Sequence, residues 1–585
     1  MASFYAELDI LPGLKFKSSY GADLSFWGSD GYGMKEYRGT MAHTDQSWVN
    51  SSMNRGFRWQ VENVLTYQKT FAEKHNLTVV LGQSANRYTY RYLSGSDYSL
   101  LDTDPLKANI DYAVADRAEE RVSGGTGGYD KVSLASYFGR VDYNYDERYM
   151  AQFTLRRDGS SVFGTNNKWA TFPAVSIGWN VWNEPYLKNV KPSNFLYMSL
   201  MDGGENYYFG GSYNPTSEAN EGTMVYGSSP GRVANADVKW ETSEQIDLGV
   251  DLRFFNSRLS FTFDYFTKKT KDMLAYMPVP TYIGQSSPMG NLGRMKNWGY
   301  EFELGWKDRI KDFSYFINAN ISVLKNKMID LGNESGETDY EGAGAGGVGT
   351  YVHAKNGEVW PYFYGLQTNG LFQNWDEVNS YVNADGNLIQ PNAHPGDVRF
   401  VDLDGDGAIG SGDRTKIGKG APDVTFGFTL GAEWKGFDFS AAFQGTLGND
   451  VFDFAQRGDV PAMNRPSWIL DRWIGEGTSN KIPRMTSANP NGNWQSSDLF
   501  IKNGSYMRLK NIQLGYTLPQ NITRIASIQR LRVYVSAENL LTITGYDGFD
   551  PELGGGDGAS ATAMGVDKGI YPQSRTVFVG ANITF

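Results

Sequence analysis

The sequence contains no cysteine and only four histidines, so several kinds of site are ruled out from the start. Without cysteine there is no disulfide framework, no thiol catalysis and no thiolate-bound metal. The histidines do not show metal-site spacing, and no nucleophile motif stands between a strand and a helix. Abundant Asp and Glu are compatible with a carboxylate pair for glycoside hydrolysis, but nothing singles out two of them. We therefore do not expect an enzyme.

Long apolar runs are also missing from this chain of 585 residues. No window approaches the ~20 consecutive apolar residues that a membrane helix needs. The net charge of -11 argues against a nucleic-acid partner. Aromatic residues nevertheless reach 14%, and there are 68 glycines. This mixture is typical of β-strands joined by turns and loops.

What the chain does have is a repeated alternation of apolar and polar residues with a period of two, which is typical of strands with one apolar face. The clearest examples are 246–254, 259–266, 424–434, 531–538 and 577–585. The predicted strands have roughly 9–12 residues, which is the length that a tilted strand needs to cross a bilayer. Strands of soluble sandwiches have about 5–6 residues. We therefore predict an all-β fold, a transmembrane antiparallel β-barrel with its apolar face outward and its polar face toward the lumen.

The connections between the predicted strands alternate between short and long. The short ones include 11–13, 146–148, 256–258 and 435–436, and the long ones include 27–54, 97–131, 203–239, 326–422, 446–504 and 543–573. Outer-membrane barrels have short periplasmic turns and long extracellular loops, which matches this asymmetry. We count about 17 strands, an odd number, whereas closed bacterial barrels have an even one. We therefore expect further strands upstream of Met1.

Several segments carry a family resemblance, and they occur in family order from about residue 137 to the end. They are YFGRVDYNYDERYMAQFTLRRDGSSVFGTNNKWATFPAVSIGWNVWNEPYL (137–187), DVKWETSEQIDLGVDLRFF (237–255), PGDVRFVDLDGDGAIGSGDRTKIG (395–418), FGFTLGAEWKGFDFSAAFQGTLGNDVF (426–452), SYMRLKNIQLGYTLP (505–519) and LRVYVSAENLLTITGYDGFDPE (531–552). On these motifs the chain resembles the SusC/RagA family of TonB-dependent outer-membrane transporters.

The resemblance implies a barrel of about 22 strands in the outer membrane of a Gram-negative bacterium. It implies import of oligosaccharides or peptides under a SusD-like surface lipoprotein lid, driven through the TonB complex. Residues 1–585 would be the C-terminal part of the barrel, with the signal sequence, TonB box and plug before Met1, so this part alone would not be competent. The alternatives are a passive outer-membrane pore and a calcium-dependent soluble glycan-binding β protein.

The segment DLDGDGAIGSGD (402–413) has the ligand spacing of a calcium loop. Such loops supply hard oxygen ligands at alternate positions and a glycine for the sharp turn. The expected ligands are the carboxylates of Asp402, Asp404, Asp406 and Asp413 and the carbonyl of Ala408. Position 12 is Asp rather than the longer Glu, and no helical pattern flanks the loop. The other reading is an Asp- and Gly-rich extracellular turn.

Aromatic residues of the long 326–422 connection form a second candidate site. Trp360, Tyr362, Tyr364 and Phe372 could stack on sugar rings or anchor a partner, or they could pack together and stiffen the loop. The chain ends in Phe585 after an alternating strand. A terminal aromatic residue resembles the signal read by the outer-membrane barrel assembly machinery.

Overall fold

The architecture was analysed in a computed structural model. It describes residues 2–39, 42–44, 46–100, 104, 107–110, 113, 123–127, 131–164, 166–185, 194–200, 235, 237–277, 288–341, 348–454, 467–486, 489–553 and 561–585. Most of the predicted loop 203–239 lies outside these residues. The chain divides into two compact units. Unit 1 comprises Met1–Gly178, Asp202–Thr242 and Leu274–Asn291, and unit 2 comprises Trp179–Met201, Ser243–Met273 and Leu292–Phe585.

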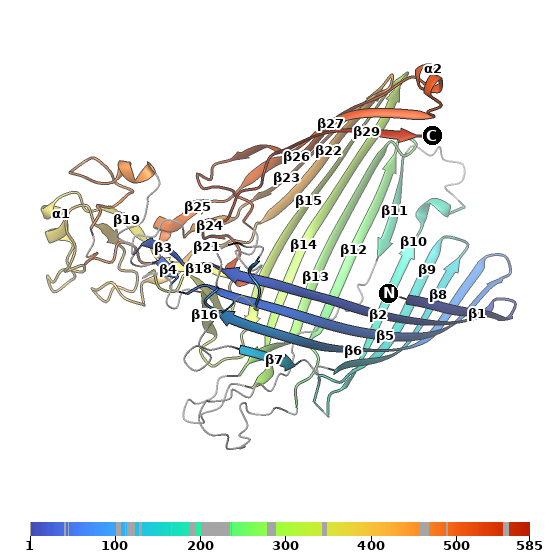
Figure 1. Ribbon diagram of the computed structural model, residues 1–585, viewed down its shortest axis with the longest axis horizontal. Coiled ribbons are helices and arrows are strands. Elements are labelled where there is room, and N and C mark those ends of the chain that lie inside the picture. Colours follow the sequence, from blue (N-terminus) through green and yellow to red (C-terminus); the bar gives the residue numbers. More distant parts are fainter. Residues whose placement is uncertain are drawn as a thin grey trace. The chain divides into compact units, whose positions relative to one another are not determined.

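Unit 1 is built on an antiparallel ladder in which long strands follow one another in chain order, β1–β2–β5–β6–β8–β9 (Figure 1). Its strands are β1 (Ala2–Leu11), β2 (Leu14–Gly33), β3 (Glu36–Gly39), β4 (Ala42–Thr44), β5 (Trp48–Phe71), β6 (His75–Tyr98), β7 (Ser123–Gly127), β8 (Lys131–Tyr145), β9 (Tyr149–Ser160) and β10 (Trp169–Trp179). The short strand β7 pairs only with the far end of β6.

Unit 2 is also built mainly from long antiparallel strands. Its long strands are β11 (Asn194–Leu200), β12 (Thr242–Phe254), β13 (Leu259–Tyr276), β14 (Met289–Ile310), β15 (Phe313–Asp330), β22 (Val424–Trp434), β23 (Phe437–Leu447), β26 (Tyr506–Thr517), β27 (Arg530–Thr544) and β29 (Thr576–Thr584). From β14 onward they form one antiparallel ladder, β14–β15–β22–β23–β26–β27–β29. With those of unit 1, these strands confirm the predicted all-β architecture of about 17 long antiparallel strands.

Tight turns close one end of these hairpins, as the spacing predicts. The turn between β8 and β9 is 146–148, and the turn between β22 and β23 is 435–436. Asp146 and Glu147 have positive φ angles of 54°, and Lys435 and Gly436 have 47° and 88°. Left-handed residues match the right-handed twist of the flanking strands, so Asp, Asn and Gly are favoured at such turns.

The connection predicted over 27–54 is shorter than expected, because β2 runs to Gly33 and β5 begins at Trp48. Outside the bilayer a strand does not need an apolar face. The alternation of apolar and polar residues therefore ends there, while the backbone hydrogen bonding between strands continues. This is why the sequence pattern underestimates strand length at this end.

The long connections of unit 2 fold into a packed loop module. It contains β16 (Glu337–Glu341), β17 (Val352–Lys355), β18 (Tyr362–Leu366), β19 (Thr368–Leu371), β20 (Val398–Phe400), β21 (Arg414–Gly418), β24 (Asp450–Asp453), β25 (Ile501–Asn503) and β28 (Val566–Asp567). Strands β16, β17, β18 and β21 form one sheet, and β24, β25 and β28 another. Its core includes Tyr351, Phe363, Phe452 and Phe500, all buried.

Helical structure is sparse in the described residues. The α-helices are α1 (Trp375–Ser380) and α2 (Gln520–Thr523), and short 3-10 turns cover Val181–Asn183, Ser467–Asp471, Asp498–Phe500, Arg524–Ala526 and Ala561–Ala563. No helix in the described ranges has the length and apolar character to cross a membrane.

Candidate functional site

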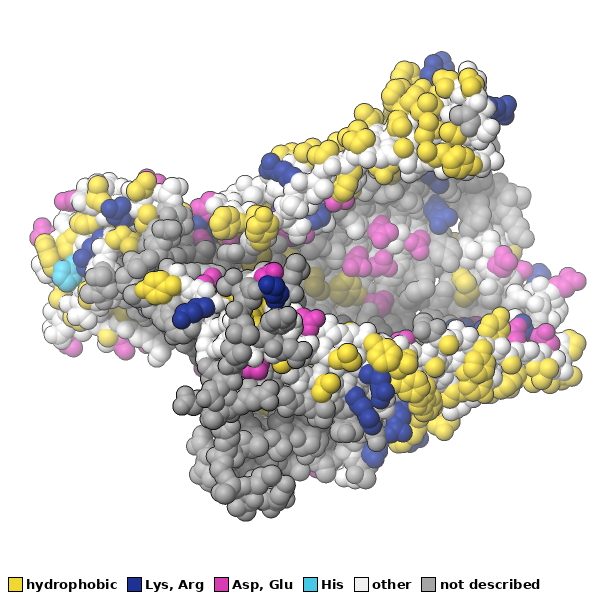
Figure 2. All heavy atoms as spheres, in the orientation of Figure 1, with side chains coloured by type: hydrophobic (Ala, Val, Ile, Leu, Met, Phe, Trp, Pro, Cys, Tyr) yellow, Lys and Arg dark blue, Asp and Glu magenta, His cyan; other side chains and the backbone are white. Residues whose placement is uncertain are grey.

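Carboxylates gather on the polar face of β12, β13 and β14. The alternation of residues 246–254 puts Asp247 and Asp251 on this face of β12, and the adjoining strands add Asp264, Glu301 and Glu303. Thr262 of β13 donates a hydrogen bond to Asp251 (2.7 Å), and Ser322 of β15 donates one to Glu301 (3.2 Å). We call these five carboxylates the acidic wall. Figure 2 shows Asp and Glu side chains gathered on the inner surface of this part of the molecule.

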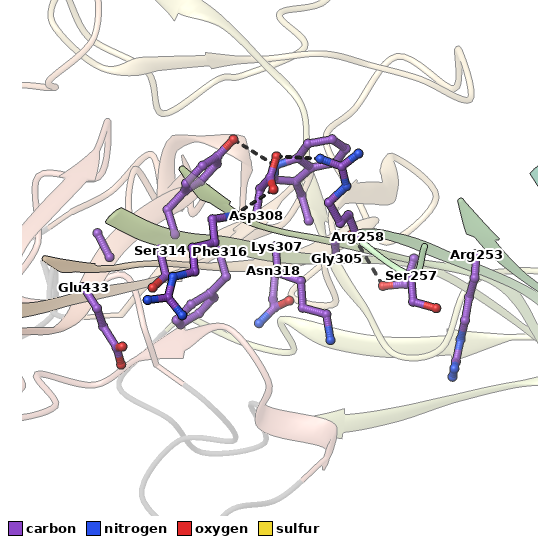
Figure 3. Close-up of a pocket in the computed structure, with 15 residues that line it drawn as sticks. Arg253, Ser257, Arg258, Gly305, Lys307, Asp308, Ser314, Phe316, Asn318 and Glu433 are labelled. Carbon is purple, nitrogen blue, oxygen red and sulfur yellow. Dashed lines mark hydrogen bonds and ion pairs between the residues drawn. The ribbon is translucent and has the colours of Figure 1, made fainter. Parts of the chain in front are cut away.

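A cavity of about 840 Å³ lies on the same polar face, nearer the tight turns of β12–β15 and β22 (Figure 3). Its cationic lining residues are Arg253, Arg258, Lys307 and Arg309. Arg258 is paired with Asp308 at 3.1 Å. Along β14 the polar face therefore changes from acidic at Glu301 and Glu303 to basic at Lys307 and Arg309. Alternation alone predicts which residues share this face, but not that their charges segregate along it.

The aromatic residues of the long connection mostly pack inside the loop module. Phe372 is completely buried, against Val378 and Ala393, and Tyr362 is also buried. Trp360 and Tyr364 are half-buried. The segment is fixed to strand β15 because Asn326 exchanges two hydrogen bonds with the backbone of Trp360, at 2.6 and 2.8 Å.

Tyr364 belongs to a stack centred on His353 of β17. The two rings lie 4.3 Å apart with an interplanar angle of 18°, and Tyr362 meets the same imidazole edge-on at 5.5 Å. The imidazole Nδ1 lies 2.7 Å from Asp339. Burial raises the pKa of both tyrosines above its ordinary value. Both phenols therefore remain neutral at physiological pH.

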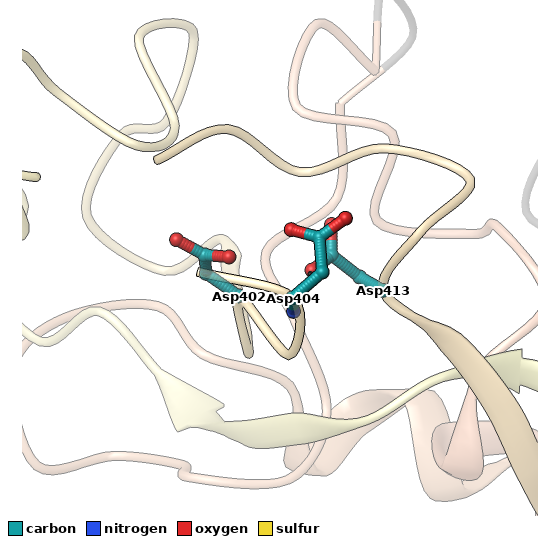
Figure 4. Close-up of side chains that lie close together, drawn as sticks. All are labelled: Asp402, Asp404 and Asp413. Carbon is teal, nitrogen blue, oxygen red and sulfur yellow. Dashed lines mark hydrogen bonds between the residues drawn. The ribbon is translucent and has the colours of Figure 1, made fainter. Parts of the chain in front are cut away.

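The predicted calcium loop brings three of its carboxylates together (Figure 4). Oxygens of Asp402, Asp404 and Asp413 lie within 4.8 Å of one another, the one such group of metal-ligating side chains found in the described residues. Asp413 is buried and accepts hydrogen bonds from the N–H groups of Leu403 (2.6 Å) and Gly410 (2.7 Å).

Asp406 and Ala408 lie outside this carboxylate group. The Asp406 carboxylate accepts a hydrogen bond from the N–H of Ala408 at 2.9 Å, which is the local Asx turn expected of a short acidic side chain. Gly407 has a φ of +86°, so the sharp turn at this glycine is present as the motif predicts.

Sequence reasoning missed three ion pairs, formed by the buried residues Arg508 and Asp397. Arg508 of β26 is buried and contacts Asp550 and Glu552, at 2.5 and 2.8 Å. Asp397, fully buried, contacts Arg484 at 2.7 Å. These partners lie 42 to 87 residues apart in the sequence, so no local sequence pattern predicts the pairs.

With this geometry in place, comparison with known proteins decides the family. Residues 4–540 match the model of the TonB dependent receptor-like β-barrel. The chain belongs to this family. It is therefore an outer-membrane protein of a Gram-negative bacterium, and the polar face of its strands is the lumen face. The family is one of receptors rather than enzymes.

Individual relatives confirm the resemblance to SusC and RagA. The chain is 32% identical to TonB-dependent receptor P3 of Formosa agariphila, over 100% of this chain and 58% of that protein. It is 31% identical to TonB-dependent receptor SusC of Bacteroides thetaiotaomicron, over 77% of this chain and 44% of that protein. The fold matches the RagAB peptide importer in its open-open state with a TM-score of 0.79, at 24% identity, over 100% of this chain and 60% of that one. The chain thus spans about half the length of the relatives it matches.

Proposed function

We propose that the receptor containing this chain imports nutrient molecules, oligosaccharides or peptides, across the outer membrane. The observation that carries the proposal is the match of residues 4–540 to the TonB-dependent receptor barrel. A solved structure with a similar fold, RagAB, is described as a peptide importer, which supports transport by this architecture. TonB would supply the energy for this import.

A SusD-like surface lipoprotein is the proposed partner at the loop end. Support comes from the relative named SusC and from the packed loop module, which offers a stable surface rather than separate mobile loops. Of the four aromatic residues singled out in the sequence, Trp360 and Tyr364 keep some exposed surface for substrate or partner contact. Phe372 and Tyr362 instead hold the module together.

Deletion and rescue test the proposal in the native bacterium. A strain lacking the full-length receptor should lose uptake of a fluorescent peptide or oligosaccharide pool and regain it with the wild-type gene. Removing TonB should abolish the rescued uptake. If uptake persists without TonB, the passive pore is the better explanation. If neither pool depends on the receptor, the import proposal fails.

We also propose that the loop 402–413 binds calcium through Asp402, Asp404 and Asp413. The clustered carboxylates support this, and extracellular modules need only Kd values of about 10⁻⁴–10⁻³ M. Titration of the purified full-length receptor with CaCl2 should show saturable binding that Asp404→Asn weakens at least tenfold. Asp385→Asn, on an exposed neighbouring loop, is the matched control. Equal binding by both variants would refute the site.

Phe585 is proposed to act as part of the assembly signal. It follows β29 and is 78% exposed, so its ring contributes little to packing within the described chain. Phe585→Ala should lower the amount of folded receptor in the outer membrane without lowering the unfolding temperature of the folded fraction. A stability loss of the same size in purified protein would favour an ordinary packing role.

A further inference from the structure

Strands β12 and β14 carry charged residues on the lumen face in the same order. On β12 the acidic Asp251 is followed by Arg253, and on β14 Glu303 is followed by Lys307. Both strands run toward their tight turns, so both change from acidic to basic in the same direction. Strand β13 runs away from its turn, and its carboxylate on this face, Asp264, comes five residues after the strand begins at Leu259. Neighbouring strands thus agree that the lumen face is acidic farther from the turns and basic beside them.

The basic end of this face is the cavity of about 840 Å³ described above, which we call the basic cavity. Figure 3 shows Arg253, Lys307 and Glu433 pointing to one side of the sheet, while Arg258 and Asp308 lie on the other side. Alternation agrees, because Lys307 and Asp308 are consecutive residues of one strand. Arg258 and Asp308 pair with each other at 3.1 Å. This pair therefore does not offset the charge of the cations that face the lumen.

The cations of the basic cavity are available to a ligand. The side chains of Arg253 and Lys307 make no hydrogen bond or ion pair with the residues that the structure describes. Arg309 donates from Nε to the carbonyl of Lys311 at 2.9 Å, which fixes it beside the turn and leaves its terminal N–H groups. On the lumen side of the cavity lining, Glu433 is the one carboxylate. The excess of positive charge in a cavity attracts anions more strongly than the same charges on an open surface.

An aromatic ring and neutral polar groups complete the basic cavity. Phe316 of β15 pairs with Lys307 on one side and with Gly431 on the other. Its ring lies over Gly431, where an added Cβ would be 2.1 Å from a ring carbon, and the side chain is 37% exposed. Ser314 and Asn318 flank it on the same face of β15. The cavity thus offers cations, an apolar surface and hydrogen-bonding groups together, which matches a carboxylate attached to an amide and an apolar side chain, as at the end of a peptide.

The acidic and basic groups are separated by the length of a short peptide. Glu303 and Lys307 are four residues apart on β14, and Glu301 and Arg309 are eight apart. At about 3.3 Å per residue these separations are roughly 13 and 26 Å. An extended peptide spans at most about 3.3–3.6 Å per residue, so about four to eight residues cover the same distance. A peptide with free ends is cationic at one end and anionic at the other at neutral pH. An acidic oligosaccharide carries negative charge alone, which the acidic wall repels.

We propose that the basic cavity binds the C-terminal carboxylate of a peptide of about four to eight residues, whose N-terminal ammonium group lies against the acidic wall. The carboxylate accepts hydrogen bonds from Arg253 and Lys307, and a guanidinium group holds a carboxylate through paired N–H donors. The apolar side chain of the last residue lies on the ring of Phe316. This inference rests on the proposed import function and deepens it, because it selects peptides over oligosaccharides and orients the C-terminus toward the tight turns.

Equilibrium dialysis of the purified full-length receptor tests the proposal. The probe is a radiolabelled hexapeptide of alanine and serine in three forms: with both ends free, with a C-terminal amide, and with an N-terminal acetyl group. We expect the wild type to bind the free peptide about three- to tenfold more tightly than the amide, since one ion pair in water corresponds to roughly fivefold. The test variant carries Arg253→Gln and Lys307→Gln. It should bind the free peptide and the amide equally, and still bind the acetylated peptide more weakly than the free one.

A reciprocal variant and a control make the result specific. Glu301→Gln with Glu303→Gln should remove the difference between the free and acetylated peptides and keep the difference between the free peptide and the amide. The control is Lys435→Gln, which removes a positive charge at the same end of the strands. Lys435 lies over the ring of Trp434 and does not line the basic cavity. This control should bind all three peptides as the wild type does. Ratios between peptides within one preparation cancel differences in the amount of folded receptor.

Three results would overturn the inference. The first is equal affinity of the wild type for the free peptide and the amide. The second is a preference for the free peptide that survives in the Arg253 and Lys307 variant. The third is tighter binding of a uronic acid oligosaccharide of similar length than of the free hexapeptide, which would assign the cavity to acidic sugars. Binding to purified receptor requires neither TonB nor uptake. If the deletion strain kept normal uptake while the purified receptor preferred the free peptide, the import proposal would fail and the peptide site would stand.

Discussion

The guanidinium of Arg484 donates hydrogen bonds to both carboxylate oxygens of Asp397, at 2.7 and 3.1 Å. Asp397 is completely buried, and Asn493 also donates to it, at 2.9 Å. This pair joins two long connections of the loop module that are far apart in the sequence. A folded loop module therefore depends on buried polar contacts as well as on its aromatic core.

Breaking this pair should loosen the module locally. Asp397→Ala leaves Arg484 without its buried partner, which typically costs about 3–5 kcal/mol. Hydrogen exchange of the full-length receptor should rise around 394–400 and 484–493. The control is Glu358→Gln, which breaks an exposed pair with Lys416 and should cost below about 1 kcal/mol. Equal effects of the two variants would show that burial of the pair does not matter.

A second prediction concerns the close approach of the backbone at Gly420 to the backbone at Met564. A Cβ added to Gly420 would lie 2.0 Å from the carbonyl oxygen of Met564, so the adjoining segment must move to admit a side chain. We expect Gly420→Ala to destabilise the β24–β28 pairing by about 2–4 kcal/mol and to expose 561–569 to protease. The control is Gly410→Ala, because a Cβ added at Gly410 would meet no atom within 4 Å. Gly386→Ala would not serve as a control, because the φ of +81° at Gly386 strains any residue with a side chain. Similar protection in both the Gly420 and Gly410 variants would contradict the steric argument.

The sequence predicts the strands better than the loops, and individual elements show why. Strand β22 has the predicted bounds 424–434, because alternation is complete where one face meets lipid. Strand β13 runs to Tyr276, ten residues past the predicted 259–266, because pairing continues after the lipid-facing alternation ends. Asp402, Asp404 and Asp413 come together from local spacing alone. The Asp397–Arg484 pair has no local signal, since tertiary folding of two distant connections creates it.

Acid should weaken the contact between β26 and the segment after β27. Burial alone would raise the pKa of Asp550, but the N–H of Gln573, the Arg508 guanidinium and the N–H of Glu552 outweigh it and hold that pKa below its ordinary 3.8. A carboxyl group whose pKa is lower in the folded state than in the unfolded state stabilises the fold at pH values above its unfolded-state pKa. This stabilisation is lost as the pH falls through the folded-state pKa. Protection of 545–553 against proteolysis should therefore be constant from pH 7 to 5 and fall below about pH 4.

The variant Asp550→Asn should remove this acid dependence. Its protection at pH 6 should be lower than that of the wild type, since Arg508 keeps Glu552 but loses one of its two acidic partners. Between pH 6 and 3 its protection should change less than that of the wild type. An unchanged fall below pH 4 in the variant would assign the acid response to another carboxylate.

The last prediction follows from the proposed import function and concerns the charge of the imported molecule. The acidic wall places Glu301 and Glu303 on the lumen face of β14, and Lys307 lies on the same face two positions of alternation beyond Glu303. A carboxylate attracts a cation by about 1 kcal/mol at 4 Å in water, which corresponds to roughly fivefold in occupancy. Replacing both glutamates with Gln should therefore lower uptake of a cationic peptide several-fold relative to an anionic peptide of equal length.

Lys307→Gln is the matched control, because it changes a charge of opposite sign on the same strand and face. It should shift the uptake ratio toward the cationic peptide. The ratio of the two peptides in one cell sample cancels differences in receptor abundance, so a variant that assembles poorly still gives an interpretable result. Opposite shifts in the two variants would show that the lumen wall selects by charge. A shift of the same sign in both, or none in either, would mean that solutes do not pass along this face of β14.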